Sequence, residues 1–226
     1  MSAAPGRGGC RKAIATVGLM LGLALPPAVR AGAQLEEPLA DKVRSALAAS
    51  VADSAPPRPS FESIDDRLSY LRWLGAMSEK LKKRKSEHAV RVEFLEAVWY
   101  ESRRAGLETA LVLGLIQVES GFKKYAISSA GARGYMQVMP FWARSIGNGD
   151  ASGLFHMQTN LRFGCAILRH YLNAERGDMF LALGRYNGSR GRGEYPSAVF
   201  ANRRQYLSDG SAPSATAAAS VPNRGS

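Results

Sequence analysis

The stretch that decides the fold reads Ala110-Leu-Val-Leu-Gly-Leu-Ile-Gln-Val-Glu-Ser-Gly121. Eight of the nine residues from Ala110 to Val118 are apolar or glycine, so the segment cannot keep one side in water. It is therefore either a central strand or a buried helix. An acidic residue at Glu108, a threonine that can cap the first turn (Thr109) and a glycine stop at Gly121 favour the helix.

Glu119 lies in the last turn of this predicted helix. Desolvation and the negative end of the helix dipole both disfavour a carboxylate there, and both raise the pKa of the carboxyl group. A carboxyl group that stays protonated near neutral pH can act as a general acid. The alternative is that Glu119 reaches solvent where the helix ends, and its position alone does not separate the two interpretations.

Most of the remaining chain shows helical spacing of its apolar residues, and one broad apolar face is predicted for Leu68, Leu71, Trp73, Leu74 and Met77. We find no strand pattern, nucleotide-binding glycine loop or internal repeat in the sequence. The sequence therefore predicts an all-α protein, with room for one small irregular hairpin in the loops. The further helices expected are 39–51, 64–77, 90–104, 136–146 with an interruption near Pro140, 159–173, 180–186 and 196–207.

The first 33 residues have the pattern of a secretory signal peptide. Arg7, Arg11 and Lys12 form a positive start, and an apolar stretch from Ala13 to Leu25 precedes the small-residue cleavage site at residues 31–33. The apolar stretch is too short to cross a bilayer comfortably, although a short membrane anchor is the alternative. We expect no stable membrane anchor after cleavage and a periplasmic location.

The rest of the chain divides by composition. Residues 34–60 form an N-terminal segment that ends in a proline-rich linker, and residues 61–105 form a helical extension. Residues 106–207 are expected to form the single helical domain proper, and residues 208–226 form a disordered tail rich in alanine, serine and proline.

Charge and cysteine content limit the class of partner. The formal net charge is +11, and loss of residues 1–33, with four basic and no acidic residues, leaves +7. An exported basic protein suits an anionic cell-wall polymer or membrane surface, whereas export and the lack of zinc-finger or aromatic RNA-binding motifs argue against nucleic acid.

Cleavage also removes Cys10, so Cys165 cannot form an internal disulfide. With so few histidines and cysteines, neither a zinc site nor a Cys/His pair is expected.

Several segments resemble, in order, the soluble lytic transglycosylases of the lysozyme-like superfamily. The likeness covers residues 107–207, and a glutamate–serine pair followed at this spacing by Met-Gln-x-Met-Pro is a specific signal. The matching segments are Glu119-Ser-Gly-Phe122, Ser128–Arg133, Gly134-Tyr-Met-Gln-Val-Met-Pro140, Asn160–Gly164 with Leu168–Leu172, and Tyr186-Asn187-Gly188.

This resemblance implies a lysozyme-like domain that cleaves the β-1,4 bond between N-acetylmuramic acid and N-acetylglucosamine in peptidoglycan. The muramyl C6 hydroxyl closes onto C1 and leaves a 1,6-anhydro end, with no metal or cofactor. Glu119 would be the acid and then the base. The substrate-binding residues implied are Ser128 and Gln137 near the scissile bond, Met136 beside them, Tyr186 next to Glu119, and Asn187, whose role is mainly to hold its loop.

Some positions depart from the family pattern. Tyr135 replaces a usual leucine, Arg185 stands where a small residue commonly precedes the tyrosine, and Gly188-Ser189 replaces alanine–glycine. His156 to Thr159 stand where the family has aspartate–proline before Asn160. These changes keep the acid and alter the surroundings of Tyr186.

The carboxylates of the chain give a separate check on the reaction. Ordinary glycosidases use two carboxylates, yet no aspartate or glutamate occurs between Glu119 and Asp150. A lone acid fits a route assisted by the muramyl N-acetyl group, although Asp150, Glu175 or Glu194 could be brought close by folding. The alternatives are a muramidase that uses water and a non-catalytic peptidoglycan-binding module of an envelope assembly.

Overall fold

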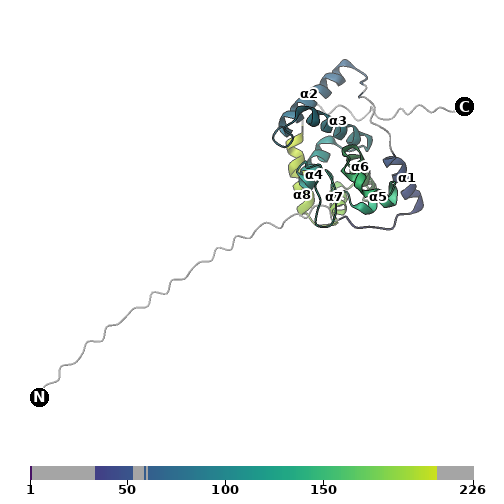
Figure 1. Ribbon diagram of the computed structural model, residues 1–226, viewed down its shortest axis with the longest axis vertical. Helices are drawn as coiled ribbons and strands as arrows, with labels where there is room; N and C mark the ends of the chain where they lie inside the picture. Colours follow the sequence, from purple (N-terminus) through teal and green to yellow (C-terminus); the bar gives the residue numbers. More distant parts are fainter. Residues whose placement is uncertain (2–33, 53–58, 60, 208–226) are drawn as a thin grey trace.

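The computed structural model describes residues 1, 34–52, 59 and 61–207 (Figure 1). The predicted signal peptide, the predicted tail and most of the proline-rich linker lie outside the described residues. The described part is all α-helical, as predicted, and contains no named strand. Its elements are α1 (Asp41–Val51), α2 (Ile64–Leu81), α3 (His88–Arg104), α4 (Thr109–Ser120), α5 (Pro140–Ile146), η1 (Ala151–Phe155), α6 (Met157–Ala174), α7 (Met179–Asn187), α8 (Glu194–Arg203) and η2 (Arg204–Tyr206).

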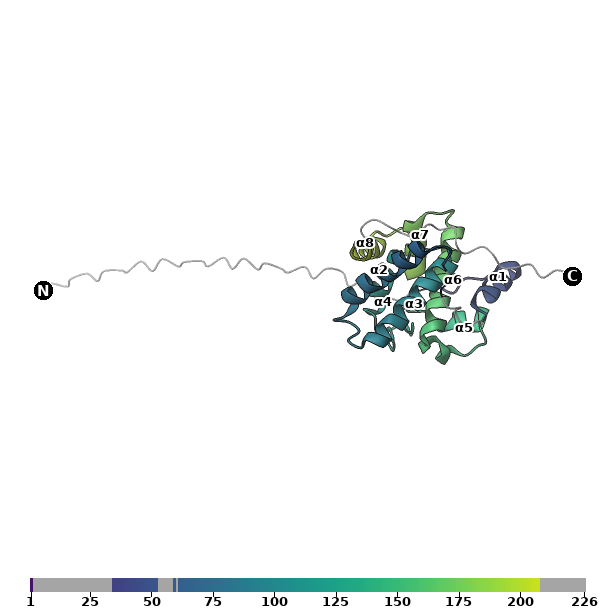
Figure 2. The same cartoon turned by 90° about the horizontal axis from the view of Figure 1, so that it is seen from above.

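Helix α4 is the buried helix that the apolar stretch predicts, and it lies at the centre of the molecule (Figures 1 and 2). It packs against α3, α8 and η2. A Cβ atom at Gly114 would lie 2.6 Å from the backbone nitrogen of Arg203, so only glycine lets α8 approach α4 this closely. Gly121 ends the helix with a φ of 56°, in the left-handed conformation expected of a C-terminal glycine.

The start of α4 differs from the prediction. Glu108 is the N-cap residue, and no side chain caps the helix. The predicted Thr109 cap is wrong, because Thr109 Oγ1 lies 2.8 Å from Ser102 Oγ and shares a hydrogen bond with that hydroxyl instead. The bond ties the first turn of α4 to the last turn of α3.

Helix α6 is the second central element and contacts α1, α3 and α7. A Cβ atom at Gly164 would lie 2.4 Å from the sulfur of Met136, so α6 lies directly against the loop that carries this methionine. Asn160 fixes the same loop, because its Oδ1 accepts from the Met136 backbone N–H at 2.8 Å and its Nδ2 donates to the Arg133 carbonyl at 2.8 Å.

Helices α2 and α3 pack against one another and share the core with the later helices. Ser63 caps α2 by accepting a hydrogen bond from the Asp66 backbone N–H at 3.0 Å. Tyr70, Trp73 and Met77 are buried, whereas Leu68 and Leu71, which the spacing placed on the same face, are exposed. Periodicity identified the helix but assigned too broad an apolar face to it.

Helix α1 lies on the side of the molecule away from α8, against α5 and α6 (Figures 1 and 2). Leu47 and Val51 are its buried residues. Across the residues that the structure describes, each helix is too short or too polar to traverse a lipid bilayer.

Candidate active site

Glu119 lies in the last turn of α4 and is 6% exposed. The chain leaves this helix through two consecutive left-handed residues, Gly121 with a φ of 56° and Phe122 with a φ of 69°. Ser120 donates a hydrogen bond to the Tyr135 carbonyl at 2.7 Å. The end of α4 is therefore fastened to the loop that follows, and the carboxyl group does not extend freely into solvent.

The Tyr195 hydroxyl donates a hydrogen bond of 2.5 Å to Oε1 of Glu119. Tyr195 comes from the first turn of α8 and is 1% exposed. Burial raises the pKa of this phenol well above its usual value, and the nearby Glu119 raises it further. The hydroxyl group therefore keeps its proton and remains a donor over the working pH range.

Tyr186 lies on α7 and is completely buried. Its hydroxyl donates to the Met136 carbonyl at 2.8 Å. Burial raises the pKa of Tyr186 well above its usual value, and Glu119 is the next largest cause. Tyr186 therefore lies within electrostatic reach of Glu119, while its hydrogen bond fastens α7 to the loop at residues 133–140.

This loop forms the small irregular hairpin, with isolated bridges that pair Arg133 with Ile127 and with Val138. Gln137 occupies its tip with a φ of 49°, a strained conformation for a residue that is not glycine. Its side-chain amide donates to the carbonyls of Gly134 at 2.9 Å and Ala126 at 3.1 Å. Gln137 is 2% exposed, so its side chain holds the loop together in this conformation.

The other predicted contact residues lie around the same loop. Ser128 Oγ accepts a hydrogen bond from the Ala132 backbone N–H at 3.1 Å, and Met136 is fully buried against Gly164. Asn187 donates to Ser189 Oγ at 3.1 Å, and its buried Oδ1 has no hydrogen-bond partner among the described residues. Contact of these residues with a glycan stays a prediction.

The carboxylates considered as a second acid are engaged elsewhere or lie on the surface. Asp150 caps η1 by accepting from the Ser152 backbone N–H at 2.8 Å, and hydrogen bonds from Ser152 lower the pKa of its carboxyl. Arg190 forms a salt bridge of 2.8 Å with Glu175, and the hydrogen bond from this arginine lowers the pKa of Glu175. Glu194 is exposed at the start of α8.

Sequence reasoning missed Tyr195 and Gln34. The predicted last helix began at Pro196, which left Tyr195 outside it, and Gln34 was assigned only to an N-terminal segment. The side chain of Gln34 is buried, accepts from Trp142 Nε1 at 3.0 Å and donates to the Gln137 carbonyl at 3.4 Å. Both contacts span more than 100 residues of chain, so no local sequence signal could reveal them.

In the described part of the chain, no three histidine, cysteine, aspartate or glutamate side chains come together in a group that could hold a metal ion. Around Glu119 the structure places the buried phenol of Tyr195, the buried phenol of Tyr186 within electrostatic reach, and the tightly bonded loop at residues 133–140.

Comparisons with known proteins converge on one family. Residues 96–204 match the family model of the transglycosylase SLT domain. The chain is 40% identical over 84 residues to membrane-bound lytic murein transglycosylase C of Mannheimia succiniciproducens, a match that covers 34% of this chain and 24% of the relative. It is 31% identical over 118 residues to the transglycosylase of Enterobacteria phage PRD1, covering 49% of this chain and 43% of the relative.

Among solved structures, a lytic transglycosylase Slt from Pseudomonas aeruginosa matches with 21% identity and a TM-score of 0.40. This match covers 62% of the present chain and 27% of the solved one. The chain thus spans less than half the length of these relatives, and the family assignment rests on the sequence match over residues 96–204.

Proposed function

Because residues 96–204 belong to the transglycosylase SLT domain family, we propose that this protein is a lytic transglycosylase that cleaves the glycan strands of peptidoglycan. The bond cleaved is the β-1,4 linkage between N-acetylmuramic acid and N-acetylglucosamine. Glu119 acts first as the acid and then as the base of the reaction.

The observation that carries this proposal is the hydrogen bond from Tyr195 to Glu119 within a buried site. A phenol that cannot easily ionise donates to a carboxyl group whether that group is protonated or not. The bond to Oε1 therefore holds the carboxyl group in one orientation through both halves of an acid–base cycle. Such positioning is what general acid–base catalysis requires of its proton donor.

In the proposed reaction, the carboxyl group of Glu119 donates its proton to the bridging oxygen as the bond between that oxygen and C1 of the muramyl residue breaks. N-acetylglucosamine leaves with a free hydroxyl group. The muramyl C6 hydroxyl then forms a bond to C1 and gives its proton to the carboxylate of Glu119. The carboxyl group is restored, no water is consumed, and the product carries a 1,6-anhydro ring.

The arrangement of the other acids supports a single acid–base group. Asp150 is used as a helix cap, and Glu175 is compensated by Arg190 and Arg185 at 2.8 and 3.3 Å. A glycosidase with two catalytic carboxyls holds them within about 10 Å of one another and aims both at the sugar. Asp150 and Glu175 are already engaged in these bonds. This favours a route in which the N-acetyl group of the substrate stabilises the positive charge that develops at C1.

The proposed place of action is the periplasm, reached by export and removal of residues 1–33. The net charge of +7 that remains would favour association with the acidic peptide stems and polymers of a cell wall. This electrostatic attraction is non-specific, and it supports encounter with the substrate more than recognition of the bond.

The test is mass analysis of the muropeptides that the protein releases from purified sacculi. We expect products lighter by one water molecule than those of a hydrolase. Glu119→Gln should lower the release by about 10²- to 10⁴-fold, whereas Glu79→Gln, which changes an exposed glutamate of α2, should leave the release unchanged.

Three outcomes would overturn the proposal. Products of full hydrolytic mass would identify a muramidase that uses water and would require a second group to activate it. A protein that sediments with sacculi and releases nothing would be a peptidoglycan-binding module. Release by Glu119→Gln at the rate of the unaltered protein would move the chemistry to another carboxyl group.

A further inference from the structure

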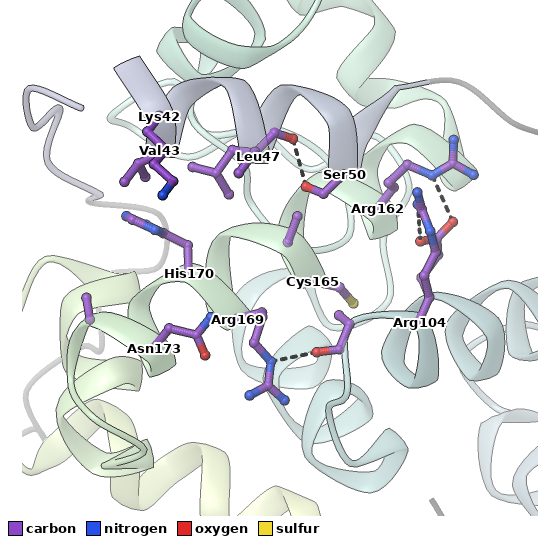
Figure 3. A pocket seen from close by; sticks show the side chains of 15 residues that line it. Lys42, Val43, Leu47, Ser50, Arg104, Arg162, Cys165, Arg169, His170 and Asn173 are labelled. Carbon is purple, nitrogen blue, oxygen red and sulfur yellow. Dashed lines mark hydrogen bonds and ion pairs between the residues drawn. The ribbon is translucent and has the colours of Figure 1, made fainter. Parts of the chain in front are cut away.

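A cavity of about 660 Å³ lies between α1 and α6, lined by none of the candidate active-site residues (Figure 3). Pockets that bind small molecules commonly measure about 300–1,000 Å³. Small residues leave this space open, because Ala46 on α1, Ala105 after α3 and Ala166 on α6 line it where larger side chains would close it.

The cavity is elongated along the two helices. Its lining positions on α6 recur every three or four residues from Arg162 to Ala174, a span of about 18 Å at the rise of an α-helix. The wall between them is apolar, with Val43 and Leu47 on one side and Cys165 on the other. The apolar middle of this elongated space suits an alkyl chain.

One end of the cavity carries basic side chains. Lys42 from α1 and His170 from α6 point toward one another there (Figure 3). Lys42 forms no ion pair with any acidic residue in the described ranges. The Trp142 ring packs edge-on against His170, with ring centroids 6.4 Å apart, and limits where the imidazole can turn.

The other charged groups around the cavity are one carboxylate and three guanidinium groups, each engaged with protein atoms. Glu101 accepts from Arg162 at 3.0 Å and pairs with Arg104 at 3.5 Å. Arg169 donates to the carbonyls of Ala105, at 2.6 Å, and Gly106. The lining is therefore positive overall, and the three arginines are engaged with protein acceptors, whereas the ammonium group of Lys42 forms no ion pair with a described acidic residue.

We propose that this cavity binds an anionic amphiphile with a single alkyl chain. Its carboxylate lies between Lys42 and His170, and its chain runs between Leu47 and Cys165. The ammonium group of Lys42 supplies the countercharge, and the imidazole of His170 donates a hydrogen bond. This binding does not involve Glu119 and is independent of the proposed function.

Calorimetric titration of the full chain with octanoate, decanoate and dodecanoate, each below its micelle concentration, tests the proposal. Burial of each further methylene should tighten binding about fourfold, so each two-carbon step should give roughly a 15-fold increase. Dodecanol should bind more weakly than dodecanoate, and dodecylamine more weakly again. Absence of saturable dodecanoate binding, or equal affinity for dodecylamine, would overturn the proposal.

Paired variants locate the site. Ala46→Phe adds a ring to a position that lines the cavity, and Ala49→Phe adds the same ring to an exposed position of α1 outside it. We expect the first to weaken dodecanoate binding by about tenfold or more, through loss of two to three buried methylenes, and the second to leave it unchanged. Equal binding by both folded variants, verified by circular dichroism, would contradict the assigned position.

A second pair tests the polar end. Lys42→Gln should remove most of the preference for dodecanoate over dodecanol, because the countercharge is lost while the apolar walls remain. Lys83→Gln, at an exposed position in the turn after α2 and outside the lining, should retain the preference. A preference that survives Lys42→Gln would show that the carboxylate lies elsewhere.

Discussion

Glu101 on α3 and Glu119 on α4 are both buried, yet their carboxyl groups meet very different partners. Glu101 is held by the guanidinium groups of Arg162 and Arg104 and by the side-chain amide of Gln158. Glu119 accepts a hydrogen bond from the neutral phenol of Tyr195.

The difference shows how a buried acid becomes structural or reactive. Loss of the Glu101 charge would leave the buried guanidinium of Arg162 without that countercharge, so this carboxylate acts as a structural ion-pair partner. A hydrogen bond from a phenol survives protonation of the carboxyl group to which it donates. The same residue type is therefore a cross-link between α3 and α6 at one position and a candidate proton carrier at the other.

The largest expected effect is on turnover. Glu119→Gln should lower the release of muropeptides by about 10²- to 10⁴-fold, because a general acid–base group is lost from an isosteric side chain. Glu101→Gln should retain measurable activity at temperatures where it stays folded. Release of muropeptides by each purified variant measures both effects, and equal losses would abolish the distinction between the two glutamates.

The next effect is on stability, and here Glu101→Gln, not Glu119→Gln, should show the larger loss. Glu101→Gln should lower the free energy of unfolding by about 3–5 kcal/mol, because a buried arginine loses its countercharge. Urea denaturation followed by circular dichroism measures this change.

Combining Glu101→Gln with Arg162→Met provides the control for this prediction. The double variant should recover part of the loss, since neither charge is then left buried and uncompensated. Strict additivity of the two single losses would show that the pair does not act as a unit.

A smaller effect is expected from the hydroxyl group of Tyr195. Tyr195→Phe should lower kcat by about 10- to 100-fold, the loss of a hydrogen bond to an ionisable group, with little change in KM. Tyr186→Phe is the matched comparison, because its hydroxyl bonds the Met136 carbonyl instead of the carboxyl group. A Tyr195→Phe variant with unaltered kcat would make this phenol a packing residue alone.

The smallest effect appears in alkaline solution. Both the Tyr186 and Tyr195 hydroxyls have a pKa raised well above 10 in the folded protein. Their contribution to stability is therefore complete below pH 10 and falls as the pH rises above it, because the unfolded chain then loses protons that the folded chain retains. Each tyrosine should contribute a slope of about 1.4 kcal/mol per pH unit.

Tyr195→Phe should reduce this alkaline slope by that amount. The free energy of unfolding from urea curves between pH 10 and 11.5 measures it. An unchanged slope would mean that Tyr195 ionises as readily in the folded protein as in the unfolded chain.

Local sequence signals predicted most of the helical framework. The apolar run and Gly121 marked both the burial and the end of α4. Pro140 begins α5, and the helix predicted for residues 136–139 is wrong because these residues belong to the loop at residues 133–140. These signals succeed because helix periodicity and the backbone requirements of glycine and proline act within a few residues. The exposed Leu68 and Leu71 show the limit, since periodicity describes a helix face without saying what covers it.

Sequence by itself identified a buried helix that ends in a glutamate, together with the motif segments around it. Only the tertiary structure decided what surrounds that glutamate. It brought Tyr195 to Glu119 through the close approach of α8 to Gly114, and it placed Gln34 against the loop at Gln137. Such contacts depend on how whole helices pack. The residues adjacent in sequence do not indicate a partner that lies 76 or 103 positions away along the chain.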